Sequence, residues 1–346
     1  MPKIYVWVIP AETEEGKMEI KDFDRHLRRV TSKAAKEVFR RWRYREEIPN
    51  TIPDGKIIFL GTGGNPEAVF NQNPHTAGFI ISLNGLRMYV DPGPGAVVRA
   101  KEMGLDLGSL DAVYVSHGHL DHYAGAESII ESMCWAMFAR RGYLLGPREV
   151  LQSEGLISKY HQGEIKGGGY PGGPEVKYLD PYVSLDLNGA ELMPVPAYHH
   201  GENYGFVLKS GNLKVGYTSD SNYIKSYTTE SGEYKELPNG PIMDLASVQH
   251  FRKDLRDVFS DVDVLIANVT AHNVWAHRHI TTIGLAHLLQ DSPRVKVCFI
   301  THFNYCCLYP VDLRDLMAKY VEKSTGVKTI AAKDGAIYNI AGTVCG

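Results

Sequence analysis

The segment Ser116 to His122, which reads SHGHLDH, constrains the fold and the chemistry of this chain more than any other part of it. It follows the apolar run Ala112 to Val115, which is expected to be a strand. Imidazole nitrogens and carboxylate oxygens are ligands for zinc, manganese and iron, so a tight turn of this composition predicts two adjacent metal ions. The alternative is that Asp121 caps a helix that starts near Ala124 and that the histidines lie on the surface.

Other candidate ligands also follow expected strands. His199, Asp220 and His302 each lie shortly after an apolar, strand-like run. His200 adjoins His199 and is a second candidate at the same place. Histidines that only fill the core would fall inside strands or on helix faces, so this recurrence favours a metal site on one rim of a sheet.

The part of the chain from Lys56 onward has the pattern of a layered domain. Short β-branched runs alternate with helical patterns and glycine-rich turns. Helices are expected, among other places, over Ala124 to Arg141 and Leu245 to Ser260, where apolar residues recur at helical spacing. Many strands with a few intervening helices predict stacked sheets that are covered by helices.

Residues 1–54 form an N-terminal extension of a different character. Between Arg25 and Arg45 there are nine basic residues and one acidic residue, Glu37, and apolar residues recur every three or four positions. This pattern predicts a basic amphipathic helix. Two interpretations stay open: the helix packs on the main domain with its basic face in solvent, or the basic face contacts a nucleic-acid backbone or another partner.

The composition excludes several classes of protein. With 37 basic and 40 acidic residues, the net charge of −3 does not by itself require a nucleic acid or an anionic membrane as partner. The five cysteines have no CxxC spacing and are expected to be reduced thiols. No apolar run approaches the roughly 18 residues of a membrane span, and the first residues do not resemble a secretion signal. We therefore expect a cytoplasmic protein that has no membrane partner.

Further motifs, in this order along the chain, resemble those of the metallo-β-lactamase-fold hydrolases, most nearly the tRNase Z-like branch. They are FLGTGG at 59–64, VDPG at 90–93, SHGHLDH at 116–122, DVLIANVT at 263–270, HRHITT at 277–282 and ITHFN at 300–304. The resemblance covers about residues 56–340. It implies an α+β fold: a four-layer αββα sandwich over residues 55–346, with a helical and glycine-rich insert at about 127–177, after the short helical extension.

The resemblance also implies a set of metal ligands. It assigns to one ion His117, His119 and a third histidine, for which the spacing to the following Gly-aromatic pair selects His199, with His200 as the fallback. It assigns Asp121, His122 and His302 to the other ion, and Asp220 as a carboxylate that bridges the two. The cofactors implied are two divalent metal ions, zinc first, with manganese or iron as alternatives.

Residues beside the metal ions receive roles from the same resemblance. A hydroxide that bridges the two ions is the nucleophile, and Asp121 accepts a proton from the attacking water. His279 assists at the phosphate or at the leaving oxygen, and a purely structural role is its alternative. Asp91 orients a ligand, unless it only forms the turn after its strand.

Two departures count against a tRNA-processing enzyme. Where the family has the carboxylate of a His-Glu-Ala-Thr string, this chain has Asn268, so the group expected to keep His279 protonated is a neutral amide. The segment Glu127 to Lys177 also contains no recognisable basic arm that would grip a tRNA. A proton relay like that of tRNase Z is therefore not expected.

These observations favour a dinuclear metal-dependent hydrolase of phosphodiesters, with a small or cyclic nucleotide or a nucleic-acid end as substrate. The alternatives are hydrolysis of a carboxylic ester, lactone or amide by the same site, or a metal-binding module without catalysis. A small molecule is the expected partner, a large nucleic acid is less favoured, and a homodimer is an expectation taken from the fold.

Two weaker signals remain. FLGTGG at 59–64 lacks the Lys-Ser/Thr of a phosphate-binding P-loop, so it is interpreted as a tight turn that borders the site. His161 and His75 are candidates to face a substrate, with a surface or packing role as the alternative for each.

Overall fold

The computed structural model describes residues 20–43, 50–152, 155–164, 172–238 and 240–340. The chain divides into two compact units, Met1–Thr51 and Ile52–Gly346. In the first unit, helix α1 (Ile20–Arg43) covers most of the stretch for which a helix is predicted; residues 44 and 45 lie outside the described residues. None of the helices in the described part of the chain is both long enough and apolar enough to cross a membrane.

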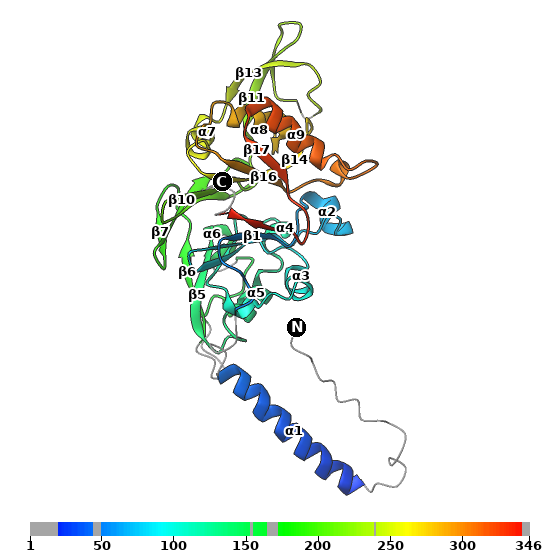
Figure 1. Ribbon diagram of the computed structural model, residues 1–346, viewed down its shortest axis with the longest axis vertical. Coiled ribbons are helices and arrows are strands. Elements are labelled where there is room, and N and C mark those ends of the chain that lie inside the picture. Colours follow the sequence, from blue (N-terminus) through cyan, green and yellow to red (C-terminus); the bar gives the residue numbers. More distant parts are fainter. Residues whose placement is uncertain (1–19, 44–49, 153–154, 165–171, 239, 341–346) are drawn as a thin grey trace. The chain divides into compact units, whose positions relative to one another are not determined.

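The second unit is built on two large sheets (Figure 1). The first sheet has seven strands, in the order β18 (Ile337–Asn339), β1 (Lys56–Phe59), β2 (Phe79–Leu83), β3 (Leu86–Val90), β4 (Ala112–Tyr114), β5 (Arg140–Gly146) and β6 (Gly173–Tyr178). The second runs β17 (Lys328–Ala331), β16 (Val297–Thr301), β14 (Val264–Ala271), β10 (Leu213–Tyr217), β9 (Tyr204–Ser210), β8 (Ala190–Pro196) and β7 (Leu185–Leu187), with β15 (Ile280–Thr281) paired to β14.

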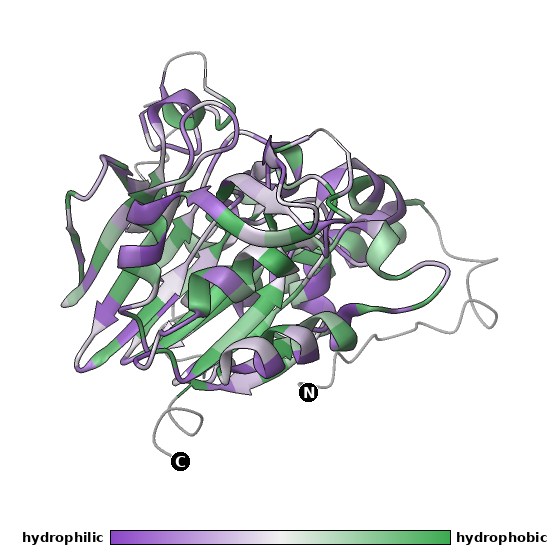
Figure 2. Cartoon of the chain, turned by 90° about the horizontal axis from the view of Figure 1, so that it is seen from above, coloured by the Kyte–Doolittle hydropathy of each residue, from purple (hydrophilic) through white to green (hydrophobic). Residues whose placement is uncertain are grey.

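Successive side chains along a strand point to opposite faces of its sheet, and in both sheets the two faces are buried. In β1, Ile57 and Phe59 belong to the core between the two sheets, whereas Ile58 belongs to a core on the outer face of the first sheet. In β14, Val264 and Leu265 divide in the same way between the central core and the outer face of the second sheet. Strands covered on both faces become nearly continuous apolar runs, and hydrophobic residues concentrate on the strands in Figure 2.

Helices cover both outer faces. On the first sheet, α3 (Ala96–Glu102) and α5 (Ala126–Met133) contribute Ala100 and Ile129 to the outer core. On the second sheet, the outer core contains side chains from α7 (Lys253–Phe259), α8 (Thr282–Leu289) and α9 (Arg314–Thr325). The layers therefore follow the order helix, sheet, sheet, helix, which confirms the predicted αββα sandwich. The short helices α2 (Asn65–Asn71), α4 (Leu120–Tyr123) and α6 (Arg148–Leu151) lie in loops.

Two predicted helices are partly wrong. Over 245–260 the chain forms strand β13 (Leu245–Phe251) before α7, because β13 pairs with β11 (Ile224–Thr229) in a separate sheet that β12 (Tyr234–Glu236) completes. Over 124–141 the helix ends at Met133, since residues 135–137 adopt positive φ angles and β5 begins at Arg140. The segment expected as a helical and glycine-rich insert thus supplies β5 and β6 to the first sheet; its residues 165–171 lie outside the described residues.

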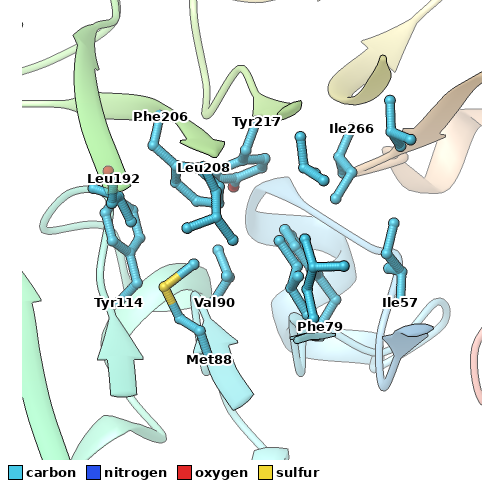
Figure 3. Close-up of a cluster of buried hydrophobic side chains, with 14 of the residues drawn as sticks. Ile57, Phe79, Met88, Val90, Tyr114, Leu192, Phe206, Leu208, Tyr217 and Ile266 are labelled. Carbon is cyan, nitrogen blue, oxygen red and sulfur yellow. The ribbon is translucent and has the colours of Figure 1, made fainter. Parts of the chain in front are cut away.

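Buried side chains from both sheets pack together in the core between them (Figure 3). Met88, Val90 and Tyr114 of the first sheet face Phe206 and Leu208 of the second, and all five are buried. Tyr114 also donates a hydrogen bond across the interface to the carbonyl of Tyr204 (2.8 Å). Dense aromatic packing of this kind fixes how the edges of the two sheets meet.

We expect the substitution Phe59→Ala to reveal the weight of this core. Phe59 is fully buried and its ring lies 6.0 Å from that of Phe299 in the other sheet, so alanine leaves a cavity between the sheets. The free energy of unfolding, measured with urea, should fall by about 3–5 kcal/mol. Phe70→Ala is the control because Phe70 is 80 % exposed, and equal losses in the two variants would contradict the expectation.

Candidate metal centre

The predicted metal ligands come from both sheets and meet at one edge of the sandwich. His117, His119 and His122 follow β4 of the first sheet, whereas Asp220 and His302 follow β10 and β16 of the second. His199 follows β8. The structure therefore brings together on one rim the residues that the sequence predicts there; their role as ligands stays a prediction.

The first group consists of His117, His119, His199 and Asp220, whose candidate ligand atoms all lie within 4.8 Å of one another. His199 Nε2 is 3.2 Å from His119 Nδ1 and 3.9 Å from Asp220 Oδ2. His117 Nε2 is buried and has no hydrogen-bond partner among the described residues. A buried polar nitrogen usually has a hydrogen-bond partner. Because His117 Nε2 has none and lies close to other candidate ligand atoms, it fits a site for a cation.

The second group consists of Asp121, His122 and His302. His302 Nε2 lies 3.3 Å from His122 Nε2 and 3.4 Å from Asp121 Oδ2. Asp220 reaches this group as well, because its Oδ1 is 3.2 Å from His302 Nε2 and its Oδ2 is 3.5 Å from His122 Nε2. The Asp220 carboxylate thus lies between the two groups, where a bridging ligand would be needed.

The outer nitrogens of three histidines are held by the protein. His117 Nδ1 lies 3.0 Å from Ser116 Oγ, and His199 Nδ1 lies 3.1 Å from the carbonyl oxygen of Arg278. His122 Nδ1 lies 2.8 Å from Asp91 Oδ2. These contacts leave each Nε2 directed at the shared space, which is how histidine ligands are oriented in metal sites. The donor set therefore fits divalent ions such as zinc.

Asp91 contacts His122, where the predicted role of orienting a ligand would place it. Its carboxylate is buried and also accepts hydrogen bonds from Ser116 and, at 2.6 Å, from the Tyr217 hydroxyl. Tyr217 belongs to the second sheet, so Asp91 links the ligand turn after β4 to the opposite sheet. Such a partner fixes the ring orientation of a ligand and raises its basicity.

The electrostatics set the protonation states of the candidate ligands, and they differ from one group to the next. Burial acts to raise the pKa of Asp220, but the charges of His302 and His122 outweigh it and hold that pKa well below its usual range. Burial, and then the charge of His122, lower the pKa of His117. At neutral pH, Asp220 is therefore an anion and His117 a neutral imidazole, as metal ligands must be. Burial acts to lower the pKa of His122, but the charges of Asp121 and Asp220 outweigh it and raise that pKa well above its usual range, so His122 would release a proton when it binds a metal ion.

His279 lies beside the second group but is not bound by Asn268. Its Nδ1 is 3.7 Å from Asp220 Oδ2 and has no hydrogen-bond partner among the described residues. Burial lowers the pKa of His279 to about 3, so the imidazole is neutral. Asn268 Nδ2 instead donates to Asp220 Oδ1 (2.8 Å) and to the Tyr217 hydroxyl (3.0 Å). The contact from Asn268 to Asp220 was not predicted from the sequence.

The remaining candidate histidines lie outside the two groups. His200 is exposed, and its ring centroid is 5.7 Å from that of His119. The geometry thus favours His199 over His200 as the third histidine. His161 lies 3.2 Å from Glu127 and 3.3 Å from Glu131, which gives it a structural explanation.

Gly64 ends the run FLGTGG, which is predicted to border the site, but its own contact with a proposed ligand was not predicted. A Cβ atom added to Gly64 would lie 2.2 Å from the ring of His302. The next residue, Asn65, donates its backbone N–H to Asp121 Oδ2 (3.0 Å). The run FLGTGG is the signal that could have found these contacts, because glycines after a strand often mark a close approach of the backbone.

A cavity of about 500 Å³ opens above the metal groups. Its floor contains His119, Asp121, His199, Asp220 and His279. The other lining residues are Asn65, Pro66, Val69, Phe70, Leu120, Trp275 and Arg278. This volume lies within the range of sites for small ligands.

Comparisons with known proteins agree with this geometry. Residues 86–237 match the model of a β-lactamase superfamily domain. A ribonuclease Z from Archaeoglobus fulgidus is 30% identical over 301 residues, which cover 81% of this chain and 95% of the relative. An uncharacterized protein from Methanocaldococcus jannaschii is 30% identical over 290 residues, which cover 81% of this chain and 93% of the relative.

A solved structure shows the same fold. The metallo-β-lactamase fold protein YhfI from Bacillus subtilis superposes with a TM-score of 0.59 at 16% identity, over 82% of this chain and 98% of that one. At this identity the likeness concerns the fold alone.

The two adjacent histidines provide a matched test of the first group. We expect His199→Ala to weaken zinc binding at least tenfold, because it removes one of four ligand atoms, and His200→Ala to leave it unchanged. Zinc affinity is measured by competition with a chelator. Equal effects in the two variants would contradict the assignment of His199.

Gly64→Ala tests the second group without removing any ligand. The φ angle of Gly64 is −152°, which alanine accepts, so the effect should come from the clash of the new Cβ with the His302 ring. We expect a folded protein with about one zinc ion fewer per chain by elemental analysis. Gly240→Ala is the control, since nothing lies within 4 Å of its added Cβ. An unchanged zinc content in Gly64→Ala would argue against His302 as a ligand.

Proposed function

The chain belongs to the metallo-β-lactamase superfamily of metal-dependent hydrolases, in its ribonuclease Z-like branch, and from this premise we propose that it hydrolyses phosphodiesters with two divalent metal ions. The position of Asp220 carries the proposal. Its two oxygens face His302 and His122 of one group, and one of them also faces His199 of the other. A carboxylate shared by two histidine groups, on the floor of a cavity, supports a dinuclear site.

The proposed reaction uses no side-chain nucleophile. When bound, two divalent ions lower the pKa of a shared water and stabilise the negative charge that develops on the phosphoryl group. The proposed ligands are His117, His119 and His199 for one ion, Asp121, His122 and His302 for the other, and Asp220 for both. Zinc is the first choice for a set of imidazole and carboxylate ligands.

Asp121 is the proposed proton acceptor. It lines the cavity, and the charge of His122 outweighs the effect of burial and holds the Asp121 pKa below its usual range. The carboxylate is therefore ionised at neutral pH and can take a proton from the attacking water. The backbone N–H of Asn65, 3.0 Å from Asp121 Oδ2, keeps the carboxylate in place.

His279 is proposed to contact the substrate as a neutral group. It lines the cavity, and its low pKa excludes an imidazolium at neutral pH. A neutral imidazole can still donate one hydrogen bond to a phosphate oxygen or a leaving oxygen. Because Asn268 holds Asp220 and not His279, the protonated histidine relay is not part of this proposal.

The choice of phosphodiesters over carboxylic esters rests on kinship. The Archaeoglobus fulgidus relative, one of two that align over 81% of this chain, is a ribonuclease by name, and ribonucleases cleave phosphodiester bonds. The four cysteines in the described residues are free thiols, in keeping with the cytoplasmic location that we propose.

The substitution Asp121→Asn tests the proposal. The zinc-loaded protein should hydrolyse bis-p-nitrophenyl phosphate faster than p-nitrophenyl acetate, and the variant should lose about 10²- to 10⁴-fold in kcat on the diester. Asp186→Asn, an exposed aspartate in β7, is the control and should keep the activity. Turnover of the acetate alone would favour an esterase, and zinc binding without turnover of either compound would favour a non-catalytic module.

A further inference from the structure

The cavity above the metal groups is lined by apolar residues as well as by charged ones, and these carry information about the substrate. The apolar lining includes Phe70, Leu120 and Trp275. Among the described residues, Arg278 is the only arginine or lysine that lines the cavity.

No side chain in the described part of the chain holds the guanidinium group of Arg278. Its side chain is exposed, and no hydrogen bond or ion pair of its guanidinium group is found among the described residues. Other arginines of the domain do have such partners: Arg148 pairs with Asp180 at 2.6 Å and Arg314 with Asp312 at 2.7 Å. An unpaired guanidinium beside a metal-binding floor is available to bind an anion from solution.

The backbone of Arg278 is nevertheless fixed to the site. Its N–H donates to the carbonyl of Trp275 (2.9 Å), and its own carbonyl oxygen lies 3.1 Å from His199 Nδ1. The N–H of His279 also donates to the carbonyl of Trp275 (2.9 Å). One short turn thus holds an aromatic ring, a cation and a cavity histidine at set positions beside a proposed ligand.

Two of the apolar side chains that line the cavity are exposed to solvent. Phe70 in α2 is 80 % exposed and Leu120 is 49 % exposed. Phe70 therefore contributes little to the core, although it lines the same cavity as the buried His279. Exposed aromatic and aliphatic side chains around a polar floor mark a binding surface for a planar apolar group.

We propose that this cavity recognises phosphate esters with one planar aromatic substituent, such as the base of a single nucleotide, and that Arg278 binds the phosphate while Phe70 and Trp275 contact the aromatic group. This inference rests on the proposed function and narrows it. A guanidinium binds two phosphate oxygens through its fork of N–H donors, and aromatic side chains stack on nucleobases of any sequence. A volume of about 500 Å³ suits one nucleotide or one chain end.

Binding of two phosphonates to the zinc-loaded protein tests the roles of the aromatic residues and of Arg278, because neither compound is hydrolysed. Phenylphosphonate and methylphosphonate share the anionic group, and neither has an ester bond to hydrolyse. We expect the wild-type protein to bind phenylphosphonate about tenfold more tightly or better, measured by titration calorimetry. Phe70→Ala should remove most of this preference and leave methylphosphonate binding nearly unchanged.

Substitution of Arg278 should weaken both phosphonates equally. A charge-assisted hydrogen bond of this kind corresponds to about 10- to 100-fold in affinity, which Arg278→Ala should lose and Arg278→Lys should lose in part. Arg140→Ala is the matched control, since Arg140 is an exposed arginine that lines a different cavity. In Arg278→Ala the KM for bis-p-nitrophenyl phosphate should rise with a smaller change in kcat.

The outcomes separate this inference from the proposed function. If the wild-type protein cleaves the diester but Arg278→Ala binds both phosphonates normally, Arg278 is not the anion site and the inference fails. Equal affinities of the wild-type protein for the two phosphonates would contradict the proposed contact of Phe70 and Trp275 with the aromatic group. If the wild-type protein cleaves no phosphodiester, the proposed function fails, whatever the phosphonates show. If the wild-type protein does cleave the diester, comparing its rates on a mononucleotide diester and on a single-stranded oligonucleotide shows whether the substrate is a free nucleotide or a chain end.

Discussion

The packing of the two sheets against each other is the constraint on which the metal centre depends. One sheet supplies the turn with His117, His119 and His122, and the other supplies Asp220 and His302. No segment of the chain contains both halves, so the distances between them are set by the side chains that fill the central core. A close-packed interior changes little in volume, and it therefore keeps the proposed ligand atoms from distant segments close to one another.

Charge balance explains the polar residues that surround this core. Two buried carboxylates, Asp91 and Asp220, would be costly without compensation, and each is paired with an imidazole and with a hydrogen-bond donor. Tyr217 connects them, because its hydroxyl donates to Asp91 and accepts from Asn268. The amide of Asn268 supports Asp220 without adding a negative charge. This neutral partner is consistent with a His279 that stays uncharged.

Much of this arrangement could be predicted from local patterns, and the rest depended on contacts between distant residues. SHGHLDH and the polar residues after strands were readable, because position at a strand end follows from sequence alone. The choice between His199 and His200 depended on which ring turns inward, and the role of Asn268 depended on a neighbour 48 positions away. Strand β13 was mistaken for helix because its apolar residues fit a helical period, whereas its pairing with β11 decides its form.

The turn from Trp275 to His279 joins two properties that proteins often vary separately. Its backbone braces His199, and its side chains form part of the surface that a substrate meets. An insertion or deletion in this turn would alter metal retention and selectivity together. Helix α2, which presents Phe70, carries none of the proposed metal ligands. Substitutions in α2 could therefore change the substrate range without affecting the proposed metal ligands, whereas changes in the turn would affect both.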